Sequence, residues 1–321
     1  MKKALVALAV ILAGVLAASE YVEFSQPTTL VLRTNSIAEL APHEHDAHKN
    51  TVDDTGHGVE IVSPTFTPAE DLWVTGFDYE TVHASSTVLH HAILSSATAP
   101  RTWCSDRPDS RFFTILTQDQ MNDPHVRFPA GYAVRIPAGT PLVLYGMLHN
   151  AEPPVGSGET YTNVYGKITL HVQVPTIRHP LKELTYYSPH LADDPCQPND
   201  YGYFFAVPEN VSDYRVTGAT AKVHTERIVF DRPTTIKYWG GHVHGWQGGK
   251  ALIVKKNGAI IQTFTTRHSD SDPYQFITPY GPADVHLKSG DTLSLEAVYD
   301  NPTDEPKIGA MGVLYIYVVN E

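Results

Sequence analysis

Short β-type runs separated by turn-forming residues are the feature that most constrains how this chain can fold. The runs are rich in Val, Ile, Thr, Tyr and Phe, with clusters of Pro, Gly, Asn and Asp between them. Clear runs occupy residues 29–34, 167–174, 251–256, 259–266, 292–299 and 312–319. The Asn257-Gly258 pair predicts a tight hairpin, because both positions of that turn need positive φ. No amphipathic pattern of helical period extends beyond about two turns, so the sequence predicts an all-β protein.

The spacing of these runs also predicts how the strands are organised. Frequent proline and glycine between many short strands is typical of jelly-roll-like antiparallel β-sandwiches. The 321 residues allow one large domain or two of ordinary size. A proline-rich stretch at 175–208 suits a linker or an extended crossing. We therefore expect two sandwich domains, residues 20–178 and residues 179–321.

The N-terminus indicates export. Lys2-Lys3 precede an uncharged apolar run from Ala4 to Ala18, which predicts a signal peptide over residues 1–19 and a secreted or periplasmic location. The run is short for a membrane-spanning helix, which needs roughly 17–25 residues. The net charge of −12 argues against nucleic acid or an anionic membrane as a partner. No membrane contact is expected beyond the signal segment.

The chain has two cysteines, Cys104 and Cys196, both in Pro- and Asp-rich stretches that look like loops. For an exported protein the simplest expectation is one disulfide bond between them. With no other cysteine, a Cys-based zinc site or an iron–sulfur cluster is excluded.

Two separated histidine sets are the strongest functional signal. His90 and His91 are adjacent, with His149 far downstream; His242 and His244 are two residues apart, with Met311 near the C-terminus. Neutral imidazole is the commonest metal ligand, and a thioether is a soft ligand that selects Cu(I). Three histidines in one half and two histidines plus a methionine in the other predict two unlike copper sites. Such a pair points to redox chemistry on O2.

Each motif also has a simpler explanation. Adjacent histidines point to opposite faces of a regular strand, so His90 and His91 reach one ion only if they use different ring nitrogens or the strand bulges. His242 and His244 share a strand face, and Gly240-Gly241 before them are expected to leave room around the rings. His268 is a candidate third ligand for zinc instead of copper. Met311 taken alone would be a core residue.

Other candidates have weaker support. Met147 is expected to pack in the core, with a role as a secondary soft ligand as the alternative. The segment with His43, His45 and His48 is expected to be exposed and flexible, although it could collect copper. The remaining histidines, His125 and His171 among them, receive no predicted role.

Four motifs together resemble the type II, ascorbate-dependent copper monooxygenases, the family of peptidylglycine α-hydroxylating and dopamine β-monooxygenases. The motifs are VLHHAIL, LVLYGMLHN, GGHVHGW and YDNPTDEPKIGAMGVLYIYV, in the order and approximate spacing of that family, and the similarity covers roughly residues 60–320. The resemblance implies two jelly-roll-like sandwiches. It assigns His90, His91 and His149 to an electron-transfer copper, and His242, His244 and Met311 to the copper that binds O2.

The substrate-holding residues of that family are only partly present. In its peptide-hydroxylating members an Arg, an Asn and a Tyr hold the substrate carboxylate; here Gly240 and Val313 stand at the first two positions, and Tyr315 alone remains. Loss of the guanidinium fork argues against a peptidylglycine substrate. We expect an exported dicopper monooxygenase of bacterial type that uses O2, a small organic substrate and a donor such as ascorbate. The alternatives are a copper-binding or storage protein without turnover and, third, a zinc enzyme built on His242, His244 and His268.

Overall fold

The computed structural model describes the chain in segments: residues 28–42, 59–85, 88–97, 111–116, 125–148, 150, 158–191, 205–217, 227–243, 248–269, 272–277 and 280–321. Within these segments the chain forms β-strands and turns and no α-helix, which confirms the all-β prediction. None of the described segments contains a helix long and apolar enough to cross a membrane. The predicted signal peptide, both cysteines and His43, His45 and His48 lie outside the described residues.

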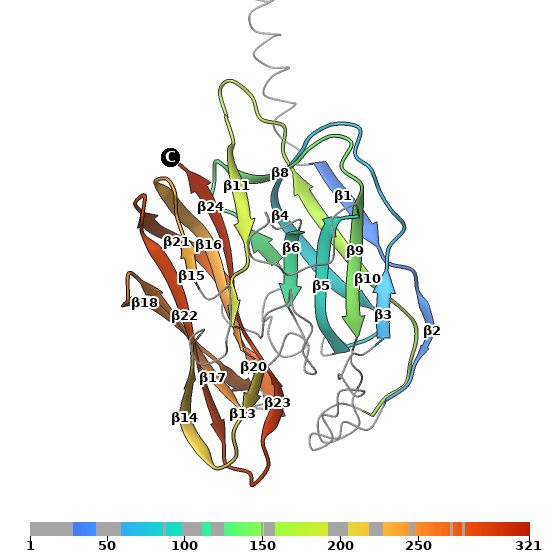
Figure 1. The fold of residues 1–321 in the computed structure, drawn as a ribbon. Coiled ribbons are helices and arrows are strands. Elements are labelled where there is room, and N and C mark those ends of the chain that lie inside the picture. The colour runs from blue at the N-terminus through green and yellow to red at the C-terminus, as the bar shows by residue number, and fades with distance from the viewer. Residues whose placement is uncertain are drawn as a thin grey trace, which may run out of the picture.

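The first β-sandwich is built from two sheets that enclose one hydrophobic cluster (Figure 1). One sheet contains β1 (Thr28–Arg33), β10 (Tyr161–Val172), β4 (Leu72–Val82) and β8 (Tyr132–Ile136), with the short strands β2 (Ile37–Leu40) and β7 (His125–Arg127) at its side. The facing sheet has the order β3 (Val59–Val62), β9 (Leu142–Leu148), β5 (Leu89–Ser96) and β6 (Arg111–Leu116). Phe77 and Phe113, from opposite sheets, meet with their ring centroids 4.7 Å apart.

The second β-sandwich encloses a second hydrophobic cluster. One layer contains β24 (Gly312–Asn320), β16 (Thr234–Val243) and β21 (Tyr280–Leu287), with β12 (His190–Leu191) at the edge of β24. The other layer has the order β14 (Val211–Val216), β22 (Thr292–Asn301), β17 (Gly249–Lys256) and β18 (Ala259–Thr265), with β15 (Arg227–Val229) also on β22. Two small sheets pair β13 (Phe205–Val207) with β23 (Lys307–Ala310), and β19 (Arg267–Ser269) with β20 (Asp272–Ile277).

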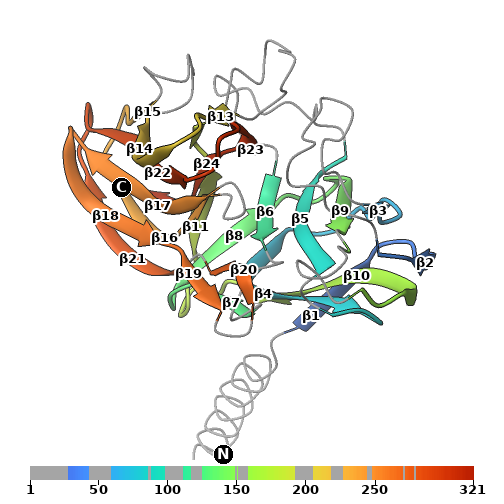
Figure 2. The same ribbon diagram turned by 90° about the horizontal axis from the view of Figure 1, so that it is seen from below.

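The strand β11 (Lys182–Tyr187) joins the two sandwiches into one continuous 11-stranded sheet (Figures 1 and 2). It pairs in parallel with β8, Leu184 opposite Val134, and antiparallel with β24, Thr185 opposite Val318. Among the described strand pairs, the β11–β8 pair is parallel and the others are antiparallel. The stretch 175–208, expected as a linker or extended crossing, thus contains the strand at the junction of the two halves.

The β16–β24 part of this sheet is buried on both faces. One face, with Tyr238, Tyr315 and Tyr317, belongs to the cluster of the first sandwich, whereas the other, with Trp239 and Leu314, belongs to the cluster of the second. Successive side chains of a strand point to opposite faces, and a strand covered on both sides is a continuous apolar run. After the register shift between Ile236 and Tyr238, the residues of β16 that alternate in step with Tyr238 are therefore directed toward the first sandwich.

The predicted hairpin between residues 251 and 266 is confirmed. Asn257 and Gly258 have φ values of 50° and 84°, and β17 and β18 pair antiparallel on either side of them, with Lys256 opposite Ala259. Positive φ at both central positions is the signature of the turn that matches strand twist.

Candidate metal centres

The adjacent histidines of the first set lie at an irregularity in β5. Leu89 pairs with Leu148 and His91 pairs with Met147, so β5 has one more residue than β9 between these two pairs. This is a β-bulge at His90, and a bulge re-aims side chains relative to a regular strand. A bulge was one of the two conditions under which both histidines could reach one ion.

The face of the sheet that carries His91 is the less buried one. Leu144 and Leu148 on β9 and Leu94 on β5 point into the first cluster, and His91 and Met147 alternate with them. Both side chains are partly buried. The prediction that Met147 packs in the core is therefore wrong: the strand register places it on the opposite face, across from His91.

His149 lies outside the described residues, but the residue after it is held firmly. Asn150 is 1% exposed, and its Nδ2 donates to the carbonyl oxygens of Leu40 at 3.0 Å and Glu159 at 2.8 Å. Its Oδ1 is buried and accepts no hydrogen bond from the described residues. Metal-bound histidines commonly donate their second ring N–H to a carbonyl or carboxylate. A spare buried acceptor beside a predicted ligand fits a histidine–metal centre.

The second set centres on the end of β16. His242 is 2% exposed and pairs with Val313, and Val243 pairs with Gly312, the residue after Met311. His242 is in step with Tyr238, so it lies on the face directed toward the first sandwich.

Met311 packs against the first hydrophobic cluster as well. The hydroxyl of Tyr299 donates to the carbonyl oxygen of Met311 and fixes its backbone. His244 lies outside the described residues.

The two glycines before His242 do not leave open space, contrary to the prediction. A Cβ on Gly240 would lie 2.7 Å from ring atoms of Tyr280, and a Cβ on Gly241 would lie 2.5 Å from the ring of Phe264. Aromatic rings thus cover the glycine backbone from both faces, a packing known to compensate for glycine in sheets. No arginine side chain can occupy the Gly240 position in this arrangement.

Tyr315 is part of an aromatic stack. It is 3% exposed, and its ring lies 5.9 Å from that of Tyr280 and 6.4 Å from that of Tyr186, with interplanar angles of 19° and 18°. Tyr280 and Tyr315 flank Gly240 from its two neighbouring strands. The Oη of Tyr280 is buried without a hydrogen-bond partner among the described residues, and burial raises the pKa of this phenol well above its ordinary value.

The zinc alternative would need a third histidine on a strand next to β16. The neighbours of β16 in the ladder are β21 and β24. His268 lies on β19, where it pairs with Phe276 of β20. Within the described residues no three His, Cys, Asp or Glu side chains gather as a metal-binding group; each predicted copper set includes a histidine outside those residues.

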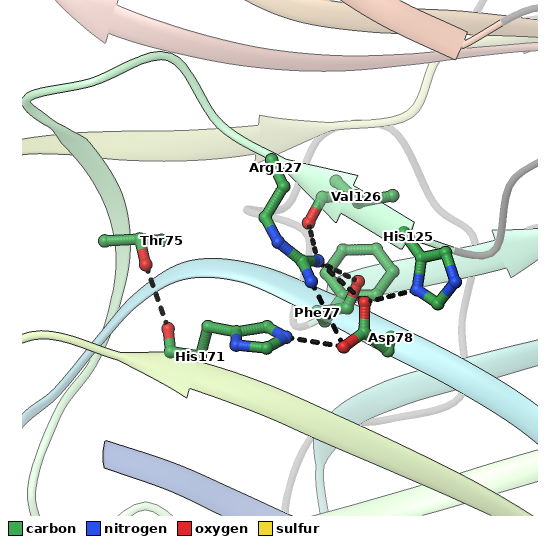
Figure 3. A network of polar contacts seen from close by, with 7 residues as sticks. All are labelled: Thr75, Phe77, Asp78, His125, Val126, Arg127 and His171. Carbon is green, nitrogen blue, oxygen red and sulfur yellow. Dashed lines mark hydrogen bonds and ion pairs between the residues drawn. The ribbon is translucent and has the colours of Figure 1, made fainter. Parts of the chain in front are cut away.

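A polar cluster in the first sandwich has no counterpart in the sequence predictions (Figure 3). Asp78 on β4 accepts hydrogen bonds from Nδ1 of His125 at 2.7 Å, from Nε2 of His171 at 2.6 Å, and from both terminal nitrogens of Arg127 at 2.7 and 3.2 Å. Arg127 also donates to the carbonyl oxygens of Phe77 and Val126. The cluster ties β4 to β7 and β10.

The charge balance of this cluster favours an ionised Asp78. Burial of the carboxyl raises its pKa, but the hydrogen bonds from Arg127, His125 and His171 outweigh that effect and hold the pKa of Asp78 well below its ordinary range. In the sequence, the alternation His125-Val126-Arg127 indicates that two hydrogen-bond donors share one strand face. The sequence does not show that Asp78 is their acceptor, because this depends on the pairing of β7 with β4.

Comparison with known proteins gives no family. No protein-family model matches the chain, and no curated protein matches it. Among solved structures, the major capsid protein P2 of bacteriophage PM2 is 10% identical over 92% of this chain and 98% of its own, with a TM-score of 0.36. PNGF-II is 8% identical, with a TM-score of 0.35, and the chain covers 65% of its length. The Sulfolobus Turreted Icosahedral Virus structure is 11% identical over 81% of this chain and 91% of that one, with a TM-score of 0.27. Similarity at this level carries no argument about activity.

Proposed function

We propose that this chain is an exported dicopper monooxygenase, which hydroxylates a C–H bond of a small organic substrate with O2 and an external electron donor such as ascorbate. The observation that carries the proposal is that His242 and Met311 share the sheet face directed toward the first sandwich, which is the sandwich with His90 and His91. Two donor sets of different softness on two joined sandwiches are compatible with a two-centre redox enzyme.

The proposed roles follow from donor chemistry. His90, His91 and His149 would hold the electron-transfer copper, and His242, His244 and Met311 the copper that binds O2. Bound copper would supply one-electron transfer and O2 activation, with the thioether favouring Cu(I). The reaction converts R–H, O2, two electrons and two protons into R–OH and water. The tightly packed face around His242, with Tyr238 and Val313 buried beside it, keeps bulk water away from the ring.

The substrate is expected to carry no carboxylate at the position used by the peptide-hydroxylating enzymes. Gly240 is covered by the ring of Tyr280, and Val313 is buried opposite His242. Neither residue offers a charged or amide donor, so this face cannot form the bidentate contact that a carboxylate favours.

A copper-binding or storage protein without turnover is the second candidate. The burial of Tyr315 between two other tyrosine rings favours it, because a residue that contacts substrate needs an accessible face. A zinc enzyme is the third candidate and has less support, because β19 is not paired with β16.

Metal stoichiometry separates these candidates. The mature protein is loaded with copper, freed of excess, and measured by plasma mass spectrometry. We expect about two coppers per chain, and about one in the His242→Ala/His244→Ala variant, because each set holds one ion. Ascorbate-driven O2 uptake matched by hydroxylated product then separates an enzyme from a carrier. One zinc and no tightly held copper would refute the proposal.

A further inference from the structure

Among the described residues, the two most exposed large apolar side chains lie in the connection between β10 and β11. Ile177 is fully exposed, at 102%, and Val174 is 73% exposed. Figure 1 shows this connection projecting beyond the neighbouring strands at the top of the view. We propose that residues 173–181, which we call the arm, form a membrane-contact site that inserts the side chain of Ile177 into an anionic bilayer surface. This proposal concerns a second surface of the protein and does not depend on copper.

Backbone hydrogen bonds fix the tip of the arm. The N–H of Thr176 donates to the carbonyl oxygen of His179 at 3.2 Å, and the N–H of His179 donates to the carbonyl oxygen of Thr176 at 3.1 Å. The hydroxyl oxygen of Thr176 also accepts from the N–H of His179, at 3.1 Å. Ile177 and Arg178 are the two residues at the centre of this closed turn. Because the turn is already ordered, contact with a bilayer has little backbone ordering to offset.

The base of the arm lies beside the start of the described chain. The N–H of Gln173 donates to the carbonyl oxygen of Trp73 at 2.9 Å, which fixes the base to β4. Thr28, the first residue of β1, lies directly opposite Val172, the last residue of β10. The apolar run of the predicted signal segment ends at Ala18, ten positions before Thr28, a length that spans at most about 36 Å. While the run is in the membrane during export, the arm is therefore held close to the same bilayer.

The charge of the arm differs from that of the whole chain. Between Thr160 and Lys182 the sequence contains no Asp or Glu, and Arg178 is in the tip itself. Attraction between a basic side chain and anionic lipid falls off within a Debye length, about 8 Å at physiological ionic strength. Charges near the tip therefore matter more for a local contact than the net charge of −12, which argues against contact over a larger surface.

The small apolar area of the arm favours a bilayer over a protein partner. A stable protein–protein interface buries roughly 800 Å² per partner, and two projecting side chains, Ile177 and Val174, supply only a small part of that area. Two copies joined through their arms would also bring both Arg178 side chains together, which is unfavourable between like charges. A bilayer needs no complementary shape, and apolar side chains beside basic ones are typical of segments that lie in its interface.

Binding of the mature chain to lipid vesicles tests the proposal. Vesicles of phosphatidylcholine, with and without phosphatidylglycerol, are separated by flotation, and the bound fraction is measured at several lipid concentrations. We expect weak, reversible binding that is stronger to the anionic vesicles, because one small apolar group gives only marginal membrane affinity. Ile177→Ser should weaken this binding about tenfold, since it removes the inserted apolar side chain. Ile260→Ser is the matched control: Ile260 is 61% exposed on β18 of the second sandwich, and binding should be unchanged.

Arg178→Gln separates the electrostatic contribution from the apolar one. It should weaken binding to the anionic vesicles about fivefold and leave binding to phosphatidylcholine alone unchanged. A wild type that binds neither kind of vesicle, or equal losses in Ile177→Ser and Ile260→Ser, would overturn the proposal. Sedimentation of the protein without lipid tests the protein partner: a dimer that Ile177→Ser dissociates would make a second copy of the chain, and not a bilayer, the occupant of the arm.

Discussion

The ring of Tyr280 covers the backbone of Gly240, its partner across the β16–β21 ladder, so closely that a Cβ on Gly240 would lie 2.7 Å from three ring atoms. The same ring stacks on Tyr315, which pairs with Gly240 from the other side. Because Gly240 has no side chain, the rings of Tyr280 and Tyr315, from the two flanking strands, can stack at this position, two residues before His242.

Gly240→Ala is expected to destabilise the fold by about 1–3 kcal/mol, because an inserted methyl group must displace a packed ring. The measurement is the urea midpoint of unfolding. Gly281→Ala is the matched control on the neighbouring strand, since a Cβ there meets nothing within 4 Å. Equal stability of the two variants would show that the Tyr280 ring yields without cost.

The cluster at Asp78 predicts a pH dependence of stability. The folded-state pKa of Asp78 is lowered, so its contribution is fully present above the unfolded-state pKa of about 3.9 and is lost as pH falls below that value. Asp78→Asn is expected to cost about 1–3 kcal/mol at neutral pH, because it weakens charge-assisted hydrogen bonds from three side chains.

The test compares unfolding free energies between pH 7 and pH 2. The wild type should lose stability below about pH 4, and the Asp78→Asn variant should lose less over the same interval. Asp71→Asn weakens a more exposed ion pair with Arg135, which also contacts Glu183, and serves as the control, with a smaller change expected. Parallel pH curves for wild type and Asp78→Asn would contradict the assignment.

Much of the architecture followed from local pattern. The strand runs at 251–256 and 259–266, and the hairpin at Asn257-Gly258, depend on backbone conformation and alternation, which neighbouring residues determine. The run at 312–319 was also predicted, because a strand buried on both faces is continuously apolar. The short strand Lys182–Tyr187 was missed. Its surrounding prolines suggested a linker, and only pairing with β8 and β24 makes it the junction strand.

The candidate sites were predictable by residue type but not by surroundings. Spacing alone indicated that His90 and His91 could share an ion only under special geometry, and the bulge that supplies one such geometry depends on register with β9. Spacing could not reveal that Tyr280 covers Gly240 or that Asp78 accepts a hydrogen bond from His125, because these partners are distant in sequence. Long-range register is the information that a single strand pattern lacks.

We expect the hydrogen bonds of Asn150 to affect copper binding at the first site. Asn150→Ala removes two hydrogen bonds that a buried side chain makes to main-chain carbonyl oxygens, which is expected to cost about 1–3 kcal/mol. It should also weaken copper binding at the first site, because His149 precedes this anchor directly. Copper affinity measured by competition with a chelator of known strength gives the result.

The control for that variant lies in the second sandwich. Asn301 is likewise fully buried, and its Nδ2 donates to the carbonyl oxygens of Pro208 at 2.9 Å and Glu305 at 2.8 Å. Asn301→Ala also breaks hydrogen bonds with Thr303, so it should lower stability at least as much and leave the affinity of the first site unchanged. A loss of copper affinity in both variants would mean that general destabilisation, not the Asn150 anchor, weakens the site.

Met311 carries the sharpest prediction for activity. Its side chain faces the first sandwich while its carbonyl oxygen is held by Tyr299, so Met311→Leu should retain the backbone and the packing volume and remove only the thioether. Hydroxylated product from ascorbate and O2 should disappear, because imidazoles alone favour Cu(I) less than a set with sulfur. Copper at the first site should persist, with total copper falling from about two per chain toward about one. Tyr299→Phe releases the carbonyl oxygen without touching the sulfur and should keep measurable turnover. Full activity in Met311→Leu would remove this residue from the proposed O2 site and leave His242 and His244 without their third ligand.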